Sequence, residues 1–229
     1  MYNRILNFLE KNNSLYETQY GFRPGRSCEH ALLNAQNSIL DSLNKRQISL
    51  LLLIDFSKAF DMVDHSILLK KLEHYGIRGL ALTWIKSYLN DRKQYVSVNG
   101  SESSMTPMKY GVPQGSILGP LLFIIYINDI PEVAHFAKFI LYADDANIII
   151  TANTIEEIND QVLNLTKSLS RWVNCNGLAL NLIIIVYLYI LILLPIKAAL
   201  RHVQIFNQSI NRFQIYLDHS FLIFITYDM

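Results

Sequence analysis

The feature that most constrains the fold is an unbroken apolar run, Leu50 to Ile54, that ends directly on the carboxylate of Asp55. A run of this length is short for a helix and is typical of a β-strand that is buried on both faces. A carboxylate at the end of such a strand is costly unless a cation meets it at the edge of the sheet. The run therefore predicts a buried strand, and Asp55 at its end is a candidate functional residue.

A second carboxylate site raises the same question. Asp144 and Asp145 stand side by side between two apolar stretches, 139–142 and 147–150, which predict a β-hairpin with the pair at its tip. An Asp-Asp pair also simply suits a tight turn, where Asp tolerates left-handed backbone geometry. Strands of an antiparallel sheet can bring Asp55 and this pair together, and carboxylate oxygens presented in this way suit Mg²⁺. Two ions about 4 Å apart would then serve phosphoryl or nucleotidyl transfer.

The remaining patterns predict an α+β fold with helices against an antiparallel sheet. Helical periodicity and capping residues predict helices over 2–10, 28–44 (opened by Ser27), 66–75 (capped by Ser66), 80–89, 116–128 and 154–177 (opened by a Thr154/Glu157 capping box). A further hairpin is predicted from 94–98 and 104–110, joined by the turn Asn99-Gly100.

Composition says more about the cellular compartment of the protein than about its activity. The net charge of +1 carries no overall basic signature, so a nucleic-acid partner would be held by a local groove of Lys and Arg. Cys28 and Cys175 are too few for a disulfide framework or a zinc cluster, which favours a reducing compartment. The N-terminal decapeptide lacks the apolar core of a signal peptide. We therefore expect an intracellular protein of the nucleus or cytoplasm.

The hydrophobic pattern of the sequence changes at residue 181, and we place a domain boundary there. Residues 182–194 are apolar without interruption, and no period follows in the remainder of the 182–229 tail. Three explanations stand, in this order: a frameshift or intron read-through, a membrane anchor, or a buried element that replaces part of another domain. As a helix the apolar run would reach only about 20 Å, short of a hydrocarbon core of about 30 Å, so a membrane partner is disfavoured.

Five motifs in residues 15–181 together resemble a known family. They are Gln-Tyr-Gly-Phe-Arg at 19–23, Leu-Ile-Asp-Phe-Ser-Lys-Ala-Phe-Asp at 53–61, Gly-Val-Pro-Gln-Gly-Ser-Ile-Leu-Gly-Pro at 111–120, Tyr-Ile-Asn-Asp at 126–129 and Leu-Tyr-Ala-Asp-Asp at 141–145. In this order and at these intervals they resemble the reverse transcriptases of non-LTR, LINE-like retrotransposons, and most closely the jockey-like elements. The resemblance implies a palm with part of the fingers over residues 1–181, and copying of RNA into DNA from an RNA template, a DNA primer and dNTPs.

The resemblance also implies roles for individual residues. Asp55, Asp144 and Asp145 resemble the catalytic carboxylates of the family. Asp55, with the backbone carbonyl of Phe56, and Asp144 resemble the ligands of two Mg²⁺ ions, for which Mn²⁺ could substitute, and the companion Asp145 is a further candidate ligand. Phe60 stands at the position of a steric gate against the ribose 2′-hydroxyl, although core packing explains it too. Gln114 and Gly115 match the loop that lines the nucleotide pocket. Arg23, Arg26 and Lys58 are weaker candidates for template or phosphate contacts, and each could equally be a solvated cation.

The chain departs from the family pattern at positions that matter for polymerase activity. Nothing upstream of Gln19 matches the fingers motif, and no primer grip or thumb follows Asn181. The family has a Lys three residues after this Asn, a candidate proton donor, whereas this chain has Ile184, which cannot donate a proton. We therefore expect impaired polymerase activity. The alternatives are a catalytically dead palm remnant that binds RNA or a partner, and a small membrane-associated protein.

Overall fold

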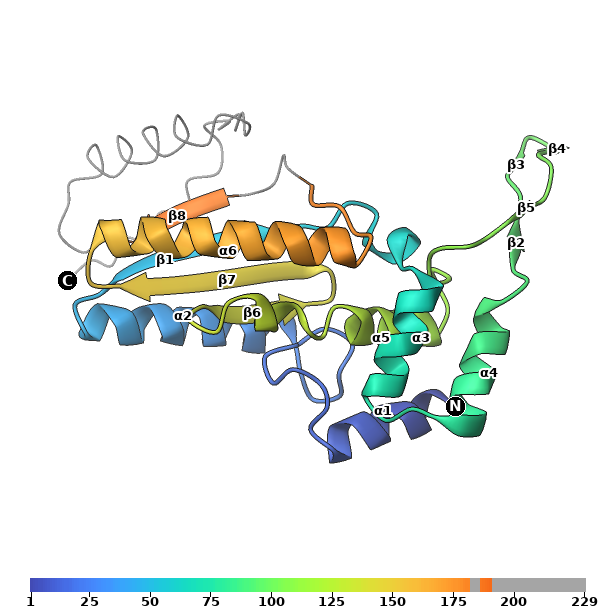
Figure 1. The fold of residues 1–229 in the computed structure, drawn as a ribbon, viewed down its shortest axis with the longest axis horizontal. Helices are drawn as coiled ribbons and strands as arrows, with labels where there is room; N and C mark the ends of the chain where they lie inside the picture. The colour runs from blue at the N-terminus through green and yellow to red at the C-terminus, as the bar shows by residue number, and fades with distance from the viewer. Residues whose placement is uncertain (182–185, 191–229) are drawn as a thin grey trace.

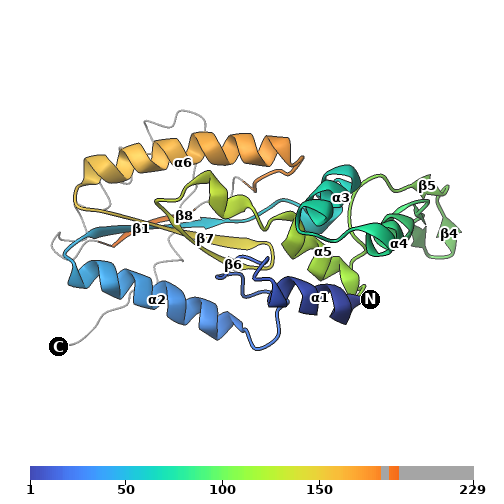
Figure 2. The same ribbon diagram turned by 60° about the horizontal axis from the view of Figure 1, so that its bottom comes forward.

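A computed structural model describes residues 1–181 and 186–190 of the chain. The described part is a sheet with one long helix on each face and a cluster of shorter helices at one end (Figures 1 and 2). The sheet order is β6-β7-β1-β8, and every neighbouring pair is antiparallel. The strands are β1 (Ile48–Ile54), β6 (Lys138–Tyr142), β7 (Asp145–Ala152) and β8 (Val186–Ile190). The predicted α+β class is confirmed.

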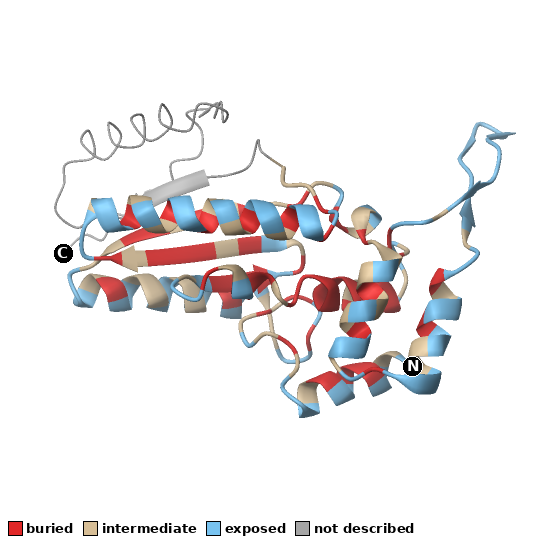
Figure 3. Ribbon diagram, in the orientation of Figure 1, coloured by how far each residue is buried: buried red, intermediate tan, exposed pale blue. Residues whose placement is uncertain are grey.

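The central strand β1 is less evenly buried than its sequence predicts. Leu50, Leu52 and Ile54 are buried, whereas Leu51 and Leu53 are only half-buried. The two faces differ because the buried residues join the main core, while Leu51 packs against a small second cluster. The prediction of a strand buried on both faces is thus right for one face only. Figure 3 shows the buried residues running along the sheet and into the helical end of the molecule.

The two long helices begin where local capping signals predict. In α6 (Ile155–Cys175), the Thr154 hydroxyl accepts the Glu157 N–H at 3.2 Å, and the Glu157 carboxylate accepts the Asn153 N–H at 3.0 Å. In α2 (Cys28–Asn44), the Ser27 hydroxyl accepts the His30 N–H. The helix α6 buries one face against β7 and β1, and α2 contacts the opposite face of the sheet (Figure 2).

The helical end surrounds one helix that is apolar on all sides. Apart from Pro120, every residue of α5 (Leu118–Tyr126) is buried. Around it lie α1 (Tyr2–Lys11), α3 (His65–His74), α4 (Gly79–Leu89), and the 3₁₀ turns η1 (Ala59–Met62) and η2 (Ile130–Val133). The predicted Ser66 cap of α3 is wrong. The carboxylate of Asp64 accepts the N–H groups of Ser66 and Ile67, because an isolated bridge to Tyr110 holds Asp64 extended.

The predicted hairpin after α4 forms an exposed arm rather than a continuous ladder. Its pieces are β2 (Lys93–Gln94), β3 (Ser97–Val98), β4 (Ser101–Glu102) and β5 (Thr106–Pro107). Asn99 and Gly100 both have positive φ, as a two-residue hairpin turn requires. All eight strand residues are exposed, so no core supports longer strands here.

The region after residue 181 is described only at 186–190, which form β8 beside β1. Most of the apolar run and the rest of the tail, Ile184 included, lie outside the described residues. None of the helices in the described part is long and apolar enough to cross a bilayer. The division at residue 181 stays a prediction.

Candidate active site

The paired carboxylates lie where β6 turns into β7. The turn consists of Ala143 and Asp144, because Tyr142 pairs with Asp145 across the hairpin. Asp145 is therefore the first residue of β7 and does not lie at the tip, as the sequence suggested. Ala143 has a φ of 57°, a left-handed conformation that costs a non-glycine residue about 1 kcal/mol or more. Neighbouring structure must stabilise this turn.

The sheet register brings Asp55 to the same edge. The last pair of β1 with β7 is Ile54 with Ala146, so Asp55 lies one step further, alongside Asp145. Burial raises the pKa of the Asp145 carboxyl, and the negative charges of Asp144 and Asp55 raise it further. The three carboxylates, separated by about ninety positions in the sequence, thus form one electrostatic group.

This group suits a divalent ion that shares its ligands with a substrate. In the described part of the chain, no group of three or more His, Cys, Asp or Glu side chains forms a metal site by itself. Mg²⁺ commonly takes one or two carboxylates and completes its shell with water and substrate phosphates. Asp55, Asp144 and the Phe56 carbonyl offer hard oxygen ligands of this kind, and the charge crowding at Asp145 is what a cation would relieve.

The segment Gln19–Gly21 supports the carboxylate turn from behind. The buried Gln19 side chain accepts the N–H of Gly21 at 2.8 Å and that of Ala143 at 3.3 Å through Oε1. Gly21 itself lies against the turn, since a Cβ there would stand 2.2 Å from the Ala143 nitrogen. The backbone of Tyr20 donates to Leu141 in β6 at 2.8 Å. The first motif of the sequence therefore braces the Ala143–Asp144 turn.

A cavity of about 410 Å³ opens beside the carboxylates. Its lining combines Asp144 with three aromatic residues, a proline-glutamine-glycine loop and one cation: Phe22, Phe56, Lys58, Ala59, Phe60, Pro113, Gln114, Gly115, Pro120 and Asp144. Five of the predicted site residues other than Asp144 are among them, namely Phe56, Lys58, Phe60, Gln114 and Gly115. The structure brings together residues that the sequence spreads over three motifs.

Phe60 packs against the core and also lines the cavity. Its ring stacks on Phe123 of α5, with 4.6 Å between centroids, and meets the edge of Phe22 at 6.3 Å. The side chain is half-buried and still lines the cavity. Packing against α5 therefore holds the ring rigidly at the cavity wall.

The Gln114 loop is anchored to the segment that follows Asp55. Gln114 donates its amide to Asp61 at 3.1 Å. Gly111, with a φ of 88°, donates its N–H to Val63, and an added Cβ would lie 3.0 Å from the Asp61 carbonyl oxygen. Gly115 has a φ of 79° with no atom near its missing Cβ, so its own requirement is conformational rather than steric.

The basic candidates separate in the structure. Lys58 is exposed, has a left-handed backbone and lines the cavity. Arg23 is buried, and its guanidinium pairs with Glu10 at 2.5 Å and donates to the Tyr16 carbonyl at 2.8 Å. These contacts join the 19–26 loop to α1, so Arg23 is not the solvated cation that the sequence left open.

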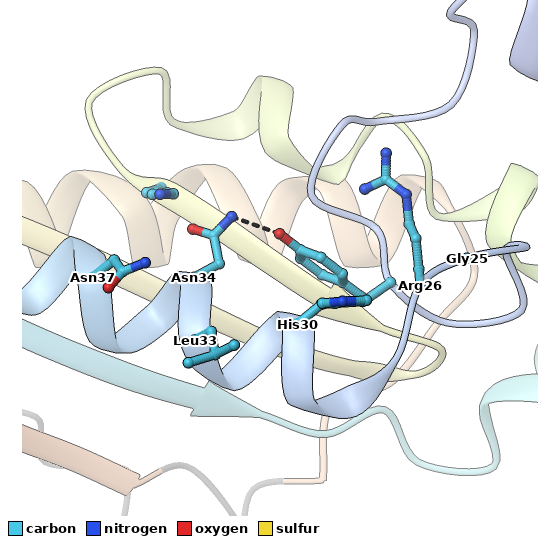
Figure 4. Close-up of a pocket in the computed structure, with 8 residues that line it drawn as sticks. Gly25, Arg26, His30, Leu33, Asn34 and Asn37 are labelled. Atoms are coloured by element: carbon cyan, nitrogen blue, oxygen red, sulfur yellow. Dashed lines mark hydrogen bonds between the residues drawn. The ribbon is translucent and has the colours of Figure 1, made fainter.

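Arg26 borders a second cavity of about 620 Å³, away from the carboxylates (Figure 4). Its guanidinium bonds to the Glu17 carbonyl and lies over the Tyr20 ring, 5.4 Å from the centroid. The lining is Tyr20, Gly25, Arg26, His30, Leu33, Asn34, Asn37 and Lys138, and none of these residues is acidic. The Asn34 amide donates to the Tyr20 hydroxyl, which the dashed line marks. The cavity is polar, shallow and biased towards anions.

Sequence reasoning missed three residues, two beside the carboxylates and one at the second cavity. Gln19 was visible only as part of a motif, and nothing in its sequence neighbourhood indicates that it supports a turn more than 120 positions away. Lys138, at the start of β6, reaches the second cavity through the fold alone. Asn181 donates to the Asp55 carboxylate at 3.2 Å. In the sequence, Asn181 stood out only through its place three residues before the position of the family's Lys.

Comparison with known proteins identifies a family and relatives of this chain. Residues 1–182 match the family described as "Reverse transcriptase (RNA-dependent DNA polymerase)". The probable RNA-directed DNA polymerase from transposon BS of Drosophila melanogaster is 32% identical over 183 residues, covering 74% of this chain and 19% of that protein. The RNA-directed DNA polymerase from mobile element jockey of the same species is 30% identical over 177 residues, with the same coverage. The chain thus spans about a fifth of the length of these relatives.

Solved structures share the fold at lower identity. Telomerase from Candida albicans, in complex with the TWJ fragment of telomeric RNA, has a TM-score of 0.63 at 16% identity. That match covers 81% of this chain and 33% of the other. Apo telomerase from Candida tropicalis has a TM-score of 0.60 at 14% identity, covering 82% of this chain and 35% of the other. At these identities the likeness is one of fold.

Proposed function

Since the chain belongs to the reverse transcriptase (RNA-dependent DNA polymerase) family, we propose that its carboxylate site serves the transfer of a nucleotide from a dNTP to a primer 3′-hydroxyl on an RNA template. The observation that carries this proposal is the convergence of Asp55, Asp144 and Asp145 at one sheet edge beside the Phe60 and Gln114 cavity. The source element would be a non-LTR, jockey-like retrotransposon, in keeping with the relatives that match.

The metal ligands follow from this proposal. Asp55, Asp144 and the Phe56 carbonyl would hold divalent ions, and Asp145 would add negative charge behind them. The bound ions would supply Lewis acidity to the primer hydroxyl and to the leaving pyrophosphate. The protein's own contribution is rigidity, because two paired strands fix the backbones that carry these side chains.

The cavity residues would orient the nucleotide. Phe60, immobilised on Phe123, would present a flat apolar wall to the sugar. Gly115 lacks a side chain, so the loop backbone could approach the base or ribose closely. Lys58, exposed at the cavity, would attract a triphosphate through its charge. Each of these assignments is a proposal about a residue that lines one common cavity.

Polymerase competence is tested directly by primer extension. Purified protein with Mg²⁺, a poly-rA template, an oligo-dT primer and dTTP should incorporate nucleotide above the level of an Asp144→Asn/Asp145→Asn variant. The neutral amides keep the shape of the site and remove its charge. Incorporation equal to that of this control would refute activity of the chain by itself.

A second candidate, a non-catalytic palm remnant, is favoured by one sequence observation. Ile184 stands where the family has a Lys, and its side chain cannot protonate a leaving group. The substitution Ile184→Lys discriminates the two candidates in the same assay. A gain in incorporation points to an impaired polymerase, whereas no gain over the Asp144→Asn/Asp145→Asn control favours the remnant.

We also propose that Arg26, with Lys138, contacts the RNA backbone at the second cavity. The absence of acidic residues from the described lining supports this role, as does the cation held over an aromatic ring. The affinity for an unstructured oligoribonucleotide should fall as the salt concentration rises. Replacing both cations with Gln should make the slope of log affinity against log salt less steep by about 1.4, or about 0.7 for each lost phosphate contact. Lys167→Gln, on the exposed side of α6, is the matched control. An unchanged slope in the double variant contradicts the assignment.

A further inference from the structure

After α6 the chain returns to the end of β1. Gly177, with a φ of 60°, redirects the backbone at the end of the helix. Residues 179–181 then run antiparallel to 55–57: the Ser57 N–H donates to the Ala179 carbonyl at 2.8 Å, and the Asn181 N–H donates to the Asp55 carbonyl at 2.9 Å. Phe56 and Leu180 form the bridge between these two bonds. The main chain of this segment thus clamps the backbone on which Asp55 is carried.

The side chain of Asn181 adds a separate contact. Its Nδ2 donates to Oδ2 of Asp55 at 3.2 Å, and both residues are half-buried. An amide is a neutral donor, so it stabilises the carboxylate without adding a cation that would compete with a metal ion. It also occupies one of the several lone-pair directions of the carboxylate and leaves the others available.

The need for such a donor comes from the neighbouring charges. The register of β1 with β7 sets Asp55 alongside Asp145, and Asp144 precedes Asp145 in the turn, so three carboxylates share one edge of the sheet. Without a fixed partner, repulsion would favour rotamers that turn the Asp55 carboxylate away from the other two. A hydrogen bond to an ionised carboxylate is among the stronger ones in proteins and holds one orientation.

We propose that Asn181 is a positioning residue, which holds the Asp55 carboxylate in the orientation that binds a divalent ion. The inference rests on the proposed function, because it assumes that Asp55 is a metal ligand. Groups that orient metal ligands from outside the coordination shell typically contribute about 10- to 100-fold in metal affinity. A purely structural Asn181 would instead contribute through its main-chain bond, which survives any change of its side chain.

The test measures Mn²⁺ binding to the full 229-residue chain by electron paramagnetic resonance of the free ion. Asn181→Leu keeps the size of the side chain without the donor, and Asn181→Ala removes the side chain in case Leu does not fold. Each variant should bind Mn²⁺ about tenfold more weakly than the unmodified chain, with an unchanged thermal melting midpoint. Asn164→Ala, exposed on α6, should match the unmodified chain, and Asp55→Asn should bind more weakly than either Asn181 variant.

The failures of the two proposals are distinguishable. If Asp55→Asn weakens binding while both Asn181 variants bind as the unmodified chain does, the positioning role is overturned and the metal site stands. If Asp55→Asn itself binds Mn²⁺ normally, the metal site assumed under the proposed function is overturned, and the role of Asn181 with it. If both Asn181 variants lose Mn²⁺ affinity and also melt at a clearly lower temperature than the unmodified chain, the proposal is overturned as well. A purely structural role of the Asn181 side chain would produce that result.

Discussion

Replacing Gly21 with Ala is expected to lower the free energy of unfolding by about 3 kcal/mol, the upper end of the usual cost of overpacking. The added Cβ would lie 2.2 Å from the nitrogen and 2.8 Å from the Cα of Ala143. Both atoms belong to the backbone of the carboxylate turn, so no flexible side chain can move aside. Either the 19–21 segment leaves β6 or the turn itself shifts. Chemical denaturation followed by circular dichroism measures the loss.

The same substitution should weaken Mn²⁺ binding, because the displaced turn carries Asp144. Gly25→Ala provides the matched control in the same loop. Gly25 has a φ of 70°, and no atom lies within 4 Å of the place that an added Cβ would take. This variant should therefore lose only the roughly 1–2 kcal/mol of a left-handed alanine and keep its metal affinity. If Gly21→Ala were as stable as the unmodified chain, the close approach of Gly21 to the turn would be contradicted.

Replacing Asp129 with Ala is expected to cost about 2–3 kcal/mol, because it leaves the charge of Lys71 without its partner. The Lys71 side chain is 13% exposed and lies 2.7 Å from Asp129. It also donates to the Tyr126 carbonyl at 2.6 Å, and Trp172 donates its indole N–H to the same carboxylate at 3.2 Å. The expected cost lies below the approximately 3–5 kcal/mol of a fully buried pair, since the Asp129 side chain is 37% exposed.

The loss of stability caused by Asp129→Ala should become smaller at alkaline pH. Burial lowers the pKa of Lys71 from its ordinary 10.5, and Asp129 opposes that effect. Without Asp129 the folded state binds the Lys71 proton still less well than the unfolded state does. Stability of the variant relative to the unmodified chain therefore rises with pH between the folded-state pKa of Lys71 in the variant and its higher folded-state pKa in the unmodified chain, because the unfolded-state contribution is the same in both. Denaturation midpoints of the variant and of the unmodified chain, each measured at neutral pH and at pH ~10, show whether the difference in stability shrinks.

A double-mutant cycle isolates the pair. Lys71→Met with Asp129→Ala should cost at least about 1 kcal/mol less than the sum of the two single changes, because the double variant buries no unpaired charge. Lys70→Met, exposed on the same helix, should be nearly neutral. Additive single effects would show that Lys71 and Asp129 do not depend on each other.

The sequence by itself determined the elements whose signals are local. The face of α6 that carries Ile158, Val162 and Leu165 follows from helical periodicity, and its start follows from the Thr154 capping box. The Asn99-Gly100 turn is equally local. The start of α3 did not follow its local signal: Asp64, which bridges to the distant Tyr110, caps the helix in place of Ser66.

Only the tertiary structure decided which of these elements meet. The motifs identified the carboxylates, but the register of β1 with β7 is what sets Asp55 alongside Asp145. The support of the turn by Gln19 and Gly21, the pairing of Arg23 with Glu10 and the contact of Asn181 with Asp55 are likewise contacts between separate segments. Periodicity and capping depend on residues within one or two turns of each other, and so can be read along the chain. Register and packing are set by the simultaneous burial of distant apolar faces, which no local stretch of sequence specifies.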